Sequence, residues 1–436
     1  MQEQRLLTAR LLHRWSFGPR PGEYAAALNI GSAGTAANLL LSTNDANRDR
    51  DLATTPAPVF ERVNKFTAPN KAEAIRRRSQ QQRLMTAWWI DRMITTNQPV
   101  LERMTWFWHG HWATSINKVQ DPRLMLKQNE TLRSTALGDF RVQSREMLRD
   151  PAMLIWLDGT GNRKGSPNEN LGREFLELFA MGVGNYAEAD VREAARALTG
   201  WRLDLDSVQS LFEPKWFDDS SKTVLNRTRN FDVDGLVDHV LANPATPQFL
   251  VKRLWLRHMA EQAPSPNDVQ ELVRSMSGTL SMQTLVAAMV NRTALDPAPR
   301  SLATSPVPWL VAVMRSLGLT MYEMSDDGQK RVIRQLMAMG QVPFVPPSVA
   351  GWPSGSTWFT STSAQARLNL SLRLVPASRV RWLAKVKPAA RPQELANHLG
   401  VPEWSPATAA VLSAKQNSAR DAFVLAINAP DYLVGV

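Results

Sequence analysis

Residues 167–178 read Pro167-Asn168-Glu169-Asn170-Leu171-Gly172-Arg173-Glu174-Phe175-Leu176-Glu177-Leu178, and their spacing decides the fold class. At about 100° per residue, Leu171, Phe175 and Leu178 fall on one apolar stripe, the pattern of a helix with one buried face. Pro167 stands near the first turn, where a missing N–H costs least. The spacing therefore predicts a helix from Pro167 to Ala180.

The same helical spacing recurs along most of the chain. Residues 69–113 predict a long helical region, broken into two helices near Asn97-Gln98-Pro99 because proline ends or kinks a helix. Residues 121–149 predict further helices.

Strand patterns are scarce by comparison. Only the region 203–233, which has mixed polarity and little helical period, suits a small β-hairpin. We therefore predict a mainly α fold without a parallel sheet, in which residues 1–436 form a single large helical domain. The alternative is a division into two lobes, residues 1–200 and 201–436.

The composition is that of an ordinary globular chain. The 436 residues are 44% hydrophobic and 21% charged, and no apolar run reaches the roughly 18 to 20 residues that span a membrane. Cysteine is absent, which excludes disulfide scaffolds, thiolate metal ligands and a cysteine nucleophile. The sequence also contains no Gly-x-Ser-x-Gly elbow, P-loop, dinucleotide fingerprint or His-Glu-x-x-His motif, so the common hydrolase and nucleotide classes are disfavoured.

The chain is basic, with 51 Lys and Arg against 40 Asp and Glu and a net charge of +11. These residues are dispersed, and the densest cluster is Arg76-Arg77-Arg78, so we predict a generally basic surface and no specific nucleic-acid site. Residues 1–10 lack the apolar core and cleavage site of a secretory leader. As written, the chain is expected to be cytoplasmic; the alternative is a periplasmic protein whose leader was removed or which a partner exports.

Tryptophan is unusually frequent, with fifteen Trp against four Tyr. Flat apolar rings with an N–H group suit sugar rings, aromatic ligands or cations. On this basis we predict substrate-binding roles for Trp108, Trp112, Trp352 and Trp358. Asn170, from the polar stripe described below, is predicted to bind substrate with them. The alternative is that the tryptophans fill a helical core and hydrogen-bond through their indoles.

His109 and His111 stand two residues apart within Trp106-Phe107-Trp108-His109-Gly110-His111-Trp112. In a regular helix they point about 200° away from each other and cannot face one ligand. In an extended segment, which Gly110 permits, both imidazoles could contribute to one metal or acid/base site. The other alternative is two partly buried histidines satisfied by hydrogen bonds.

Asn170, Arg173, Glu174 and Glu177 form a polar stripe beside the apolar one. As a catalytic arrangement, Glu174 and Glu177 are paired carboxylates whose pKa values Arg173 sets apart for acid/base work. As a structural arrangement, the stripe is a solvated face with weak ion pairs between residues four apart.

Taken together, several segments resemble the bacterial family catalogued as the DUF1800 domain. The resembling segments, in family order, are Arg14-Trp15-Ser16-Phe17-Gly18-Pro19, Phe107 to Thr114, Pro167 to Leu178, Asp190 to Trp201, Lys252-Arg253-Leu254-Trp255 and Pro343 to Pro353. The resemblance implies one helical fold and no established activity. Many relatives are encoded near a sulfatase-like family, DUF1501, whose members often look exported.

The chain departs from the family pattern at two positions. Relatives commonly carry histidines where this sequence has Glu213 and Phe217, whereas Asp218 and Lys222 remain. If those histidines act in relatives, the corresponding chemistry is altered here, which counts against a metal site.

These observations support three hypotheses of function. The first is a carboxylate-dependent enzyme that acts on a carbohydrate or another polyhydroxylated polymer, with Glu169 or Glu174 as general acid or base. In that hypothesis Arg173, His109 and His111 tune and orient the carboxylate. The second is a metal-dependent enzyme that uses His109 and His111. The third is a non-catalytic assembly or binding partner of an exported DUF1501-like protein. The sequence specifies no cofactor.

Two expectations follow for the site. Phe107 to Trp112 should pack against the Asn168–Glu177 helix, with Trp352 or Trp358 at the rim of a shared pocket. The purified protein should carry no stoichiometric, tightly bound transition metal, which elemental analysis would test.

Overall fold

Helices form most of the protein, whose computed structural model describes residues 1–64, 67–298 and 300–434. This described part contains 23 α-helices, which confirms the predicted mainly α fold. The first eleven are α1 (Gln2–Arg14), α2 (Glu23–Leu41), α3 (Asp45–Thr54), α4 (Lys71–Thr95), α5 (Pro99–His111), α6 (Ile116–Val119), α7 (Pro122–Thr135), α8 (Phe140–Leu148), α9 (Pro151–Trp156), α10 (Glu169–Glu174) and α11 (Glu188–Ala197).

The remaining helices follow the two hairpins. They are α12 (Val233–Leu241), α13 (Ala245–His258), α14 (Pro266–Ser275), α15 (Met282–Leu295), α16 (Pro306–Leu317), α17 (Asp326–Ala338), α18 (Ser361–Leu374), α19 (Arg381–Ala384), α20 (Arg391–Leu399), α21 (Pro406–Ala414), α22 (Ala419–Ala426) and α23 (Pro430–Leu433). Short 3₁₀ turns lie at Gly159–Gly161, Pro214–Trp216, Gly355–Trp358 and Pro388–Ala390. None of the described helices is both long and apolar enough to cross a bilayer.

Local signals set the ends of the helices that carry the sequence motifs. The side chain of Asn70 caps α4 by accepting a hydrogen bond from the Glu73 N–H. Pro99 occupies the first turn of α5, so the chain breaks between α4 and α5 where the sequence predicts. Asn168 likewise caps α10 through the Asn170 N–H.

The predicted helix over Pro167–Ala180 is present, but only its first half is α-helical. After α10 the chain continues as a π-helix over Phe175–Ala180. Such π-helical segments are rare and frequently occur at functional sites. The hydrophobic spacing does not distinguish an α-turn from a π-turn.

Two separate antiparallel hairpins replace the single hairpin expected near 203–233. Strand β1 (Trp201–Asp204) pairs with β2 (Gln209–Phe212), and β3 (Lys222–Val224) pairs with β4 (Arg227–Arg229). Leu225 and Asn226 join the second pair with φ angles of 45° and 63°. Glycine is the residue that such angles normally favour, so Leu225-Asn226 is a weak turn signal and the second hairpin could not be predicted separately.

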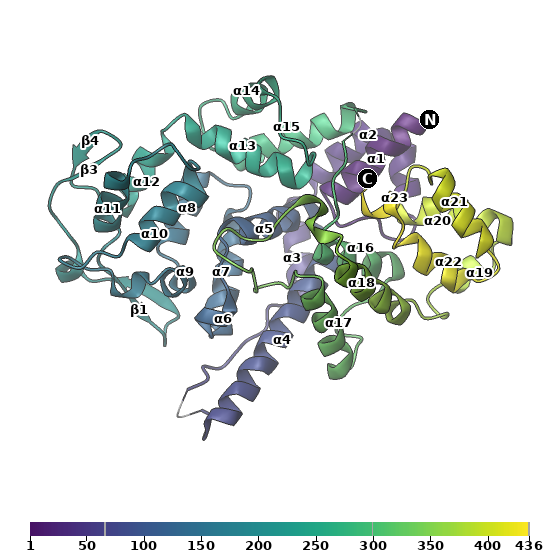
Figure 1. The fold of residues 1–436 in the computed structure, drawn as a ribbon, viewed down its shortest axis with the longest axis horizontal. Helices are drawn as coiled ribbons and strands as arrows, with labels where there is room; N and C mark the ends of the chain where they lie inside the picture. The colour runs from purple at the N-terminus through teal and green to yellow at the C-terminus, as the bar shows by residue number, and fades with distance from the viewer. Residues whose placement is uncertain (65–66, 299, 435–436) are drawn as a thin grey trace.

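Helix α5 lies near the middle of the molecule (Figure 1), and its side chains belong to two hydrophobic cores. One core contains Phe107, Trp108 and Trp112, and the other contains Trp106 and Trp352. Both cores draw residues from either side of residue 200. The alternative division into two lobes stays a prediction.

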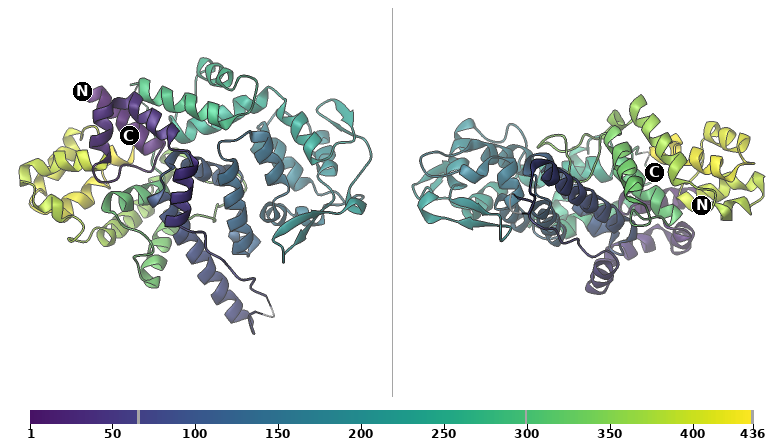
Figure 2. Two further views of the ribbon diagram at one scale, coloured as in Figure 1. Left: turned by 180° about the vertical axis from the view of Figure 1, so that it is seen from behind. Right: turned by 90° about the horizontal axis from the view of Figure 1, so that it is seen from below.

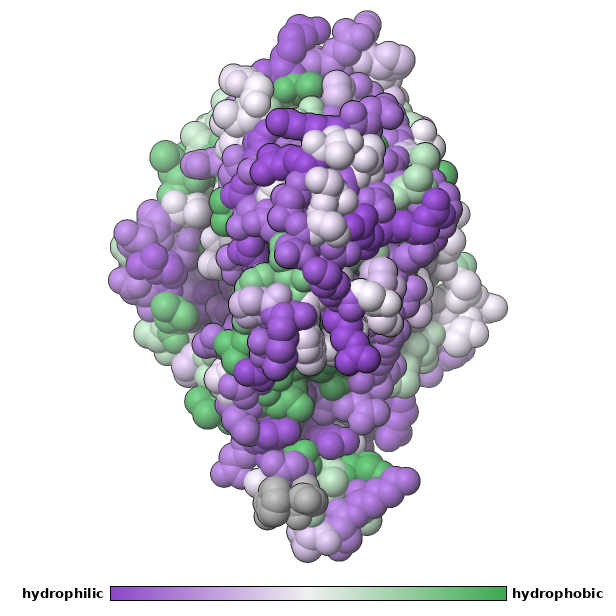
Figure 3. All heavy atoms as spheres, turned by 90° about the vertical axis from the view of Figure 1, so that its left-hand side faces the viewer, coloured by the Kyte–Doolittle hydropathy of each residue, from purple (hydrophilic) through white to green (hydrophobic). Residues whose placement is uncertain are grey.

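The two ends of the chain lie at one end of the molecule (Figures 1 and 2). Arg5 of α1 donates a hydrogen bond to the carbonyl oxygen of Pro402 at 2.9 Å. The hairpins lie at the opposite end, whose face is mostly hydrophilic with small separate apolar patches (Figure 3). This arrangement places α5 and the segments that contact it in the middle of the protein.

Candidate functional site

His109 and His111 are both buried, and they belong to different surroundings. His109 Nε2 accepts a hydrogen bond from the Phe344 N–H at 3.0 Å, and its ring lies among Trp89, Trp106 and Trp352. His111 Nε2 bonds the carbonyl oxygen of Phe179 at 3.0 Å. The two imidazoles therefore lie on opposite sides of α5.

The expectation that both histidines contribute to one site is not met, because α5 stays helical through Gly110. Burial lowers the pKa of His109 to about 3 and the pKa of His111 well below its usual 6.5, so both are neutral near pH 7. Within the described residues, no group of three or more His, Asp or Glu side chains is arranged to hold a metal ion. The expected absence of a bound metal stays a prediction.

The four tryptophans predicted to bind substrate are all buried. Trp108 and Trp112 are 0% exposed, and their indoles donate to the Ala136 carbonyl oxygen at 2.8 Å and to Gln143 Oε1 at 3.2 Å. These two lie in the core, as in the alternative in which tryptophans fill a helical core, and a substrate-binding role for them stays a prediction. Trp352 and Trp358 are 4% and 3% exposed and line cavities described below.

The aromatic segment packs against the predicted helix through the apolar side of that helix. The rings of Trp112 and Phe179 have centroids 4.5 Å apart. Phe179 lies in the π-helical half, beyond the stretch Asn168–Glu177 that we expected to make the contact. The contact is thus made by core residues, and the polar stripe is not part of it.

The polar stripe instead forms a partly exposed ion-pair network. Arg173 Nη2 lies 3.1 Å from Glu169 Oε2 and also pairs with Glu188 of α11. Glu177 accepts a hydrogen bond from the Tyr186 hydroxyl, and Asn170 is exposed. This geometry matches the structural alternative of a solvated face with ion pairs.

Glu174 is the member of the stripe with a perturbed carboxyl group. It is half-buried, and this burial raises its pKa, as does the neighbouring charge of Glu177, while Arg173 opposes both. A raised carboxyl pKa next to a second carboxylate is the arrangement that acid/base catalysis uses.

Glu213 and Phe217, the two positions at which the chain departs from the family pattern, lie beside the hairpins. Glu213 lies 3.9 Å from both Arg202 and Lys215, and Phe217 packs on Phe212. The buried ammonium of Lys222 donates to the Asp218 carbonyl oxygen and to Asn230. The second hairpin is tied to α11 by other contacts, because the Leu225 N–H donates to Asp190 Oδ1 at 2.8 Å and the Asp218 carboxylate pairs with Arg196 at 2.8 Å.

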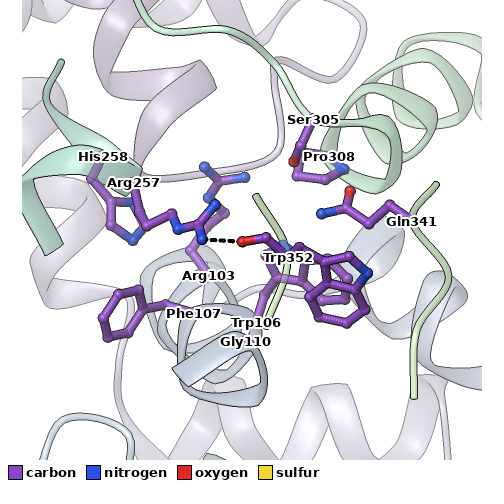
Figure 4. Close-up of a pocket in the computed structure, with 10 residues that line it drawn as sticks. All are labelled: Arg103, Trp106, Phe107, Gly110, Arg257, His258, Ser305, Pro308, Gln341 and Trp352. Carbon is purple, nitrogen blue, oxygen red and sulfur yellow. Dashed lines mark hydrogen bonds between the residues drawn. The ribbon is translucent and has the colours of Figure 1, made fainter. Parts of the chain in front are cut away.

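A cavity lined by arginine and aromatic side chains lies against α5, on a face of the helix that does not include Trp108 or Trp112. Arg103, Trp106, Phe107 and Gly110 recur at helical spacing and line a space of about 60 Å³. Arg257 and His258 come from the end of α13, and Trp352 comes from the loop after α17. Figure 4 shows the guanidinium groups of Arg103 and Arg257 pointing into this space, which the Gln341 amide faces from the other side.

A second cavity of about 60 Å³ adjoins the first. Both are lined by Arg103, Arg257, Ser305 and Pro308, and the second is also lined by His13, Arg14, Thr304, Gly355 and Trp358. Two of the predicted substrate-binding tryptophans, Trp352 and Trp358, therefore do reach a shared pair of cavities, although neither cavity contains the acidic stripe.

The arginines of these cavities have no acidic partner in the part of the chain that the structure describes. Arg103 Nε donates to the Arg14 carbonyl oxygen at 3.1 Å, and its Nη1 is buried without a hydrogen-bond partner. Arg257 donates to the carbonyl oxygens of Trp352 and Pro353. Burial lowers the pKa of Arg103 and of Arg257 to about 10, so both remain charged at neutral pH.

His258 offers the cavity a hydrogen-bond acceptor. Its Nδ1 lies 3.1 Å from the Arg14 carbonyl oxygen, which can only accept, so the proton is on Nδ1 and Nε2 carries a lone pair. Burial, and then the charge of Arg103, lower the pKa of His258 to about 3 and keep it neutral. Among the described residues His258 Nε2 and Trp352 Nε1 are both buried with no partner.

One carboxylate approaches the second cavity. Glu261 Oε1 accepts a hydrogen bond from the Ala303 N–H at 2.8 Å, and Oε2 lies 3.4 Å from the position that a Cβ on Gly355 would take. It makes no ion pair with an arginine of these cavities within the described ranges. The first cavity thus combines the two cations Arg103 and Arg257 with the Gln341 amide and with two lining residues that carry unpartnered buried nitrogens, Trp352 and His258 (Figure 4).

The fold and this site define a mainly helical protein with a small cationic, aromatic-lined cavity at its centre. The chain belongs to the family described as "Protein of unknown function (DUF1800)", whose model matches residues 10–434, and the resemblance seen in the sequence is thereby confirmed. No curated protein and no solved structure matches the chain significantly.

Proposed function

We propose that the protein binds a small oxyanion in the cavity between α5, α13 and the loop that carries Trp352. The observation that carries this proposal is that Arg103 and Arg257 face the cavity without a carboxylate partner among the described residues. A buried charge without a counter-ion is costly, and an oxyanion supplies the missing charge. Guanidinium groups are well suited to this because their planar forks match carboxylate and phosphate oxygens.

The remaining lining groups narrow the class of ligand. Trp352 Nε1 supplies a neutral donor, and His258 Nε2 supplies an acceptor that an oxyanion alone does not satisfy. The matching ligand therefore carries both a negative charge and a proton to donate, as a hydrogen phosphate group or a hydroxycarboxylate does. The volume of about 60 Å³, against the roughly 10–15 Å³ that one water requires, limits the bound group to a few heavy atoms.

Inorganic phosphate is the first probe, measured by isothermal titration calorimetry on the full chain at fixed ionic strength. Arg103→Gln removes a cation that makes a single hydrogen bond to protein, so we expect phosphate affinity to fall more than about tenfold. Arg331→Gln is the matched control, because Arg331 is exposed on α17 and does not line the cavity. Sulfate, which has no proton to donate at pH 7, should bind more weakly than phosphate.

Trp352→Phe separates binding from folding. It keeps an aromatic ring against Trp106, whose centroid lies 5.1 Å away, but removes the Nε1 donor. Because an unsatisfied buried donor costs about 1–3 kcal/mol, the free protein should keep its stability or gain some. Phosphate affinity should nevertheless fall about fivefold, which corresponds to one neutral hydrogen bond. Wild-type phosphate affinity in both variants, or no phosphate binding by the wild type, would contradict the proposal.

The raised pKa of Glu174 beside Glu177 favours a second candidate, acid/base catalysis by the stripe on α10. We expect Glu174→Gln to remove such an activity without unfolding the chain, because it keeps the shape of the side chain and deletes its charge. Activity assays on polyhydroxylated substrates, with denaturant unfolding as the control for folding, test it. A carbohydrate substrate and a DUF1501-like partner both stay predictions.

A further inference from the structure

We infer that the groove between α4 and α17 is a docking site for an acidic, amphipathic helix of a partner protein. The two helices lie side by side below the body of the molecule (Figure 1), and the groove between them has a volume of about 680 Å³. This is more than ten times the volume of the anion cavity. The inference concerns a different surface and is independent of the proposed ligand binding.

Both walls of the groove are single helix faces. On α4 the lining residues Arg76, Arg83 and Thr86 recur at helical spacing. On α17, Lys330 and Arg334 are four residues apart, and so are Ile333 and Met337. Two such faces form a trough into which a third helix can lay the side chains of one face, at positions i, i+3, i+4 and i+7.

The apolar part of the groove lining consists of Ile333 and Met337 from α17, and of Val342 and Val345 from the loop that follows. Met337 is 61% exposed, an unusual position for a large apolar side chain. Methionine adapts its shape to the partner and is common at surfaces that bind apolar helix faces.

Basic side chains also line the groove. The groove is lined by four basic residues, Arg76, Arg83, Lys330 and Arg334, and by one acidic residue, Asp326. Asp326 is held by Arg83 Nη2 at 2.8 Å, and Lys330 pairs with Asp327 at 3.3 Å with both side chains exposed.

Two of the four basic groups, Arg76 and Arg334, remain available for a partner. Glu73 is shared between Arg76 and Arg77, so it neutralises neither fully. Arg334 makes no ion pair with any residue that the structure describes. The complementary partner is therefore a helix with an apolar stripe flanked by Asp or Glu.

The composition of the groove favours a peptide over a nucleic acid. Proteins that bind single strands combine basic grooves with aromatic side chains on which bases stack. The lining of this groove contains aliphatic and methionine side chains and no aromatic residue among those described.

The test uses the full chain and a fluorescein-labelled helical peptide of about 18 residues, with leucines at i, i+3, i+4 and i+7 and glutamates on both flanks. We expect saturable binding by fluorescence anisotropy that weakens as salt increases. A peptide with the same leucines and lysines in place of the glutamates should bind more than about tenfold more weakly. Equal binding of the two peptides, or no binding of the acidic one, overturns the inference.

Variants then place the binding in the groove. Arg334→Glu reverses the lining charge that has no ion-pair partner among the described residues, and it should reduce affinity for the acidic peptide more than about tenfold. Arg331→Glu changes the charge of the same helix outside the groove lining and should reduce it much less. If the two variants lose affinity equally, the attraction is a general effect of charge and the inference fails. It also fails if an oligouridylate displaces the peptide and itself requires Arg334, because the occupant is then a nucleic acid.

Discussion

Replacing Gly351 by alanine is expected to destabilise the protein by about 2–5 kcal/mol. A Cβ at this position would stand far inside van der Waals contact with the Gly110 carbonyl oxygen and 3.1 Å from its carbonyl carbon. Both neighbours are backbone atoms of α5, which cannot rotate away. The φ angle of Gly351 is also +79°, which costs a residue with a Cβ roughly 1–2 kcal/mol. Overpacking adds about 1–3 kcal/mol to that strain.

Gly110→Ala is the matched control on the other side of the same contact. Its Cβ would meet the Trp352 ring at 3.6 Å, an ordinary contact distance. Alanine is also preferred over glycine within a helix by about 1 kcal/mol, so we expect stability to stay constant or rise slightly. Urea unfolding followed by tryptophan fluorescence measures both variants. If Gly351→Ala unfolds at the wild-type urea concentration, the close approach that holds Trp352 over α5 does not exist in solution.

The helices could be predicted because their signals are local. The break between α4 and α5 follows from Pro99. The start predicted at Pro167 is two residues early, because Asn168 caps α10, which begins at Glu169. The apolar stripe through Leu171 and Phe175 is buried as the spacing predicts. Each of these features depends on residues within one or two turns of each other.

The positions of His109 and His111 could not be predicted, because the glycine between them can adopt either an extended or a helical backbone. Gly110 permits an extended backbone, in which His109 and His111 could have shared a ligand. In the structure α5 remains helical through Gly110, and its backbone is approached closely by Gly351, which precedes Trp352. The sequence contains no sign of that neighbour, because Gly351 lies more than two hundred residues further along the chain.

The cavity could be predicted only in part for the same reason. The face formed by Arg103, Trp106, Phe107 and Gly110 is visible in the helical spacing of α5. That Arg257 faces the same space, and that no described carboxylate pairs with either arginine, depends on how distant helices pack. A net charge of +11 indicates an excess of cations but does not show which of them are buried without a partner.

Glu102→Gln is expected to destabilise the protein by about 3–5 kcal/mol, because it removes one charge from a buried ion pair. Glu102 is buried in α5 and accepts hydrogen bonds from Arg133 Nε at 2.9 Å and Nη2 at 2.8 Å, and from Trp89 Nε1 at 2.6 Å. Burial alone would raise its pKa, but Arg133 and then Arg92 outweigh burial and lower it. The glutamine keeps the shape of the side chain but leaves these arginines with less compensation. Glu169→Gln, whose ion pair with Arg173 is partly exposed, should stay within about 0.5 kcal/mol of the wild type.

Arg103, the residue after Glu102, allows a comparison between a structural charge and a proposed ligand-binding charge on α5. Glu102 and Arg103 are adjacent buried charges on α5, but only Glu102 has partners of opposite charge among the described residues. Arg103→Gln removes a charge that the free protein does not neutralise, so we expect the unfolding free energy to change by less than about 1 kcal/mol. A loss as large as that of Glu102→Gln would show that Arg103 is needed for folding, and the case for an oxyanion at this site would then fail. A small loss together with weakened phosphate binding would separate the charge that stabilises α5 from the charge that binds the ligand.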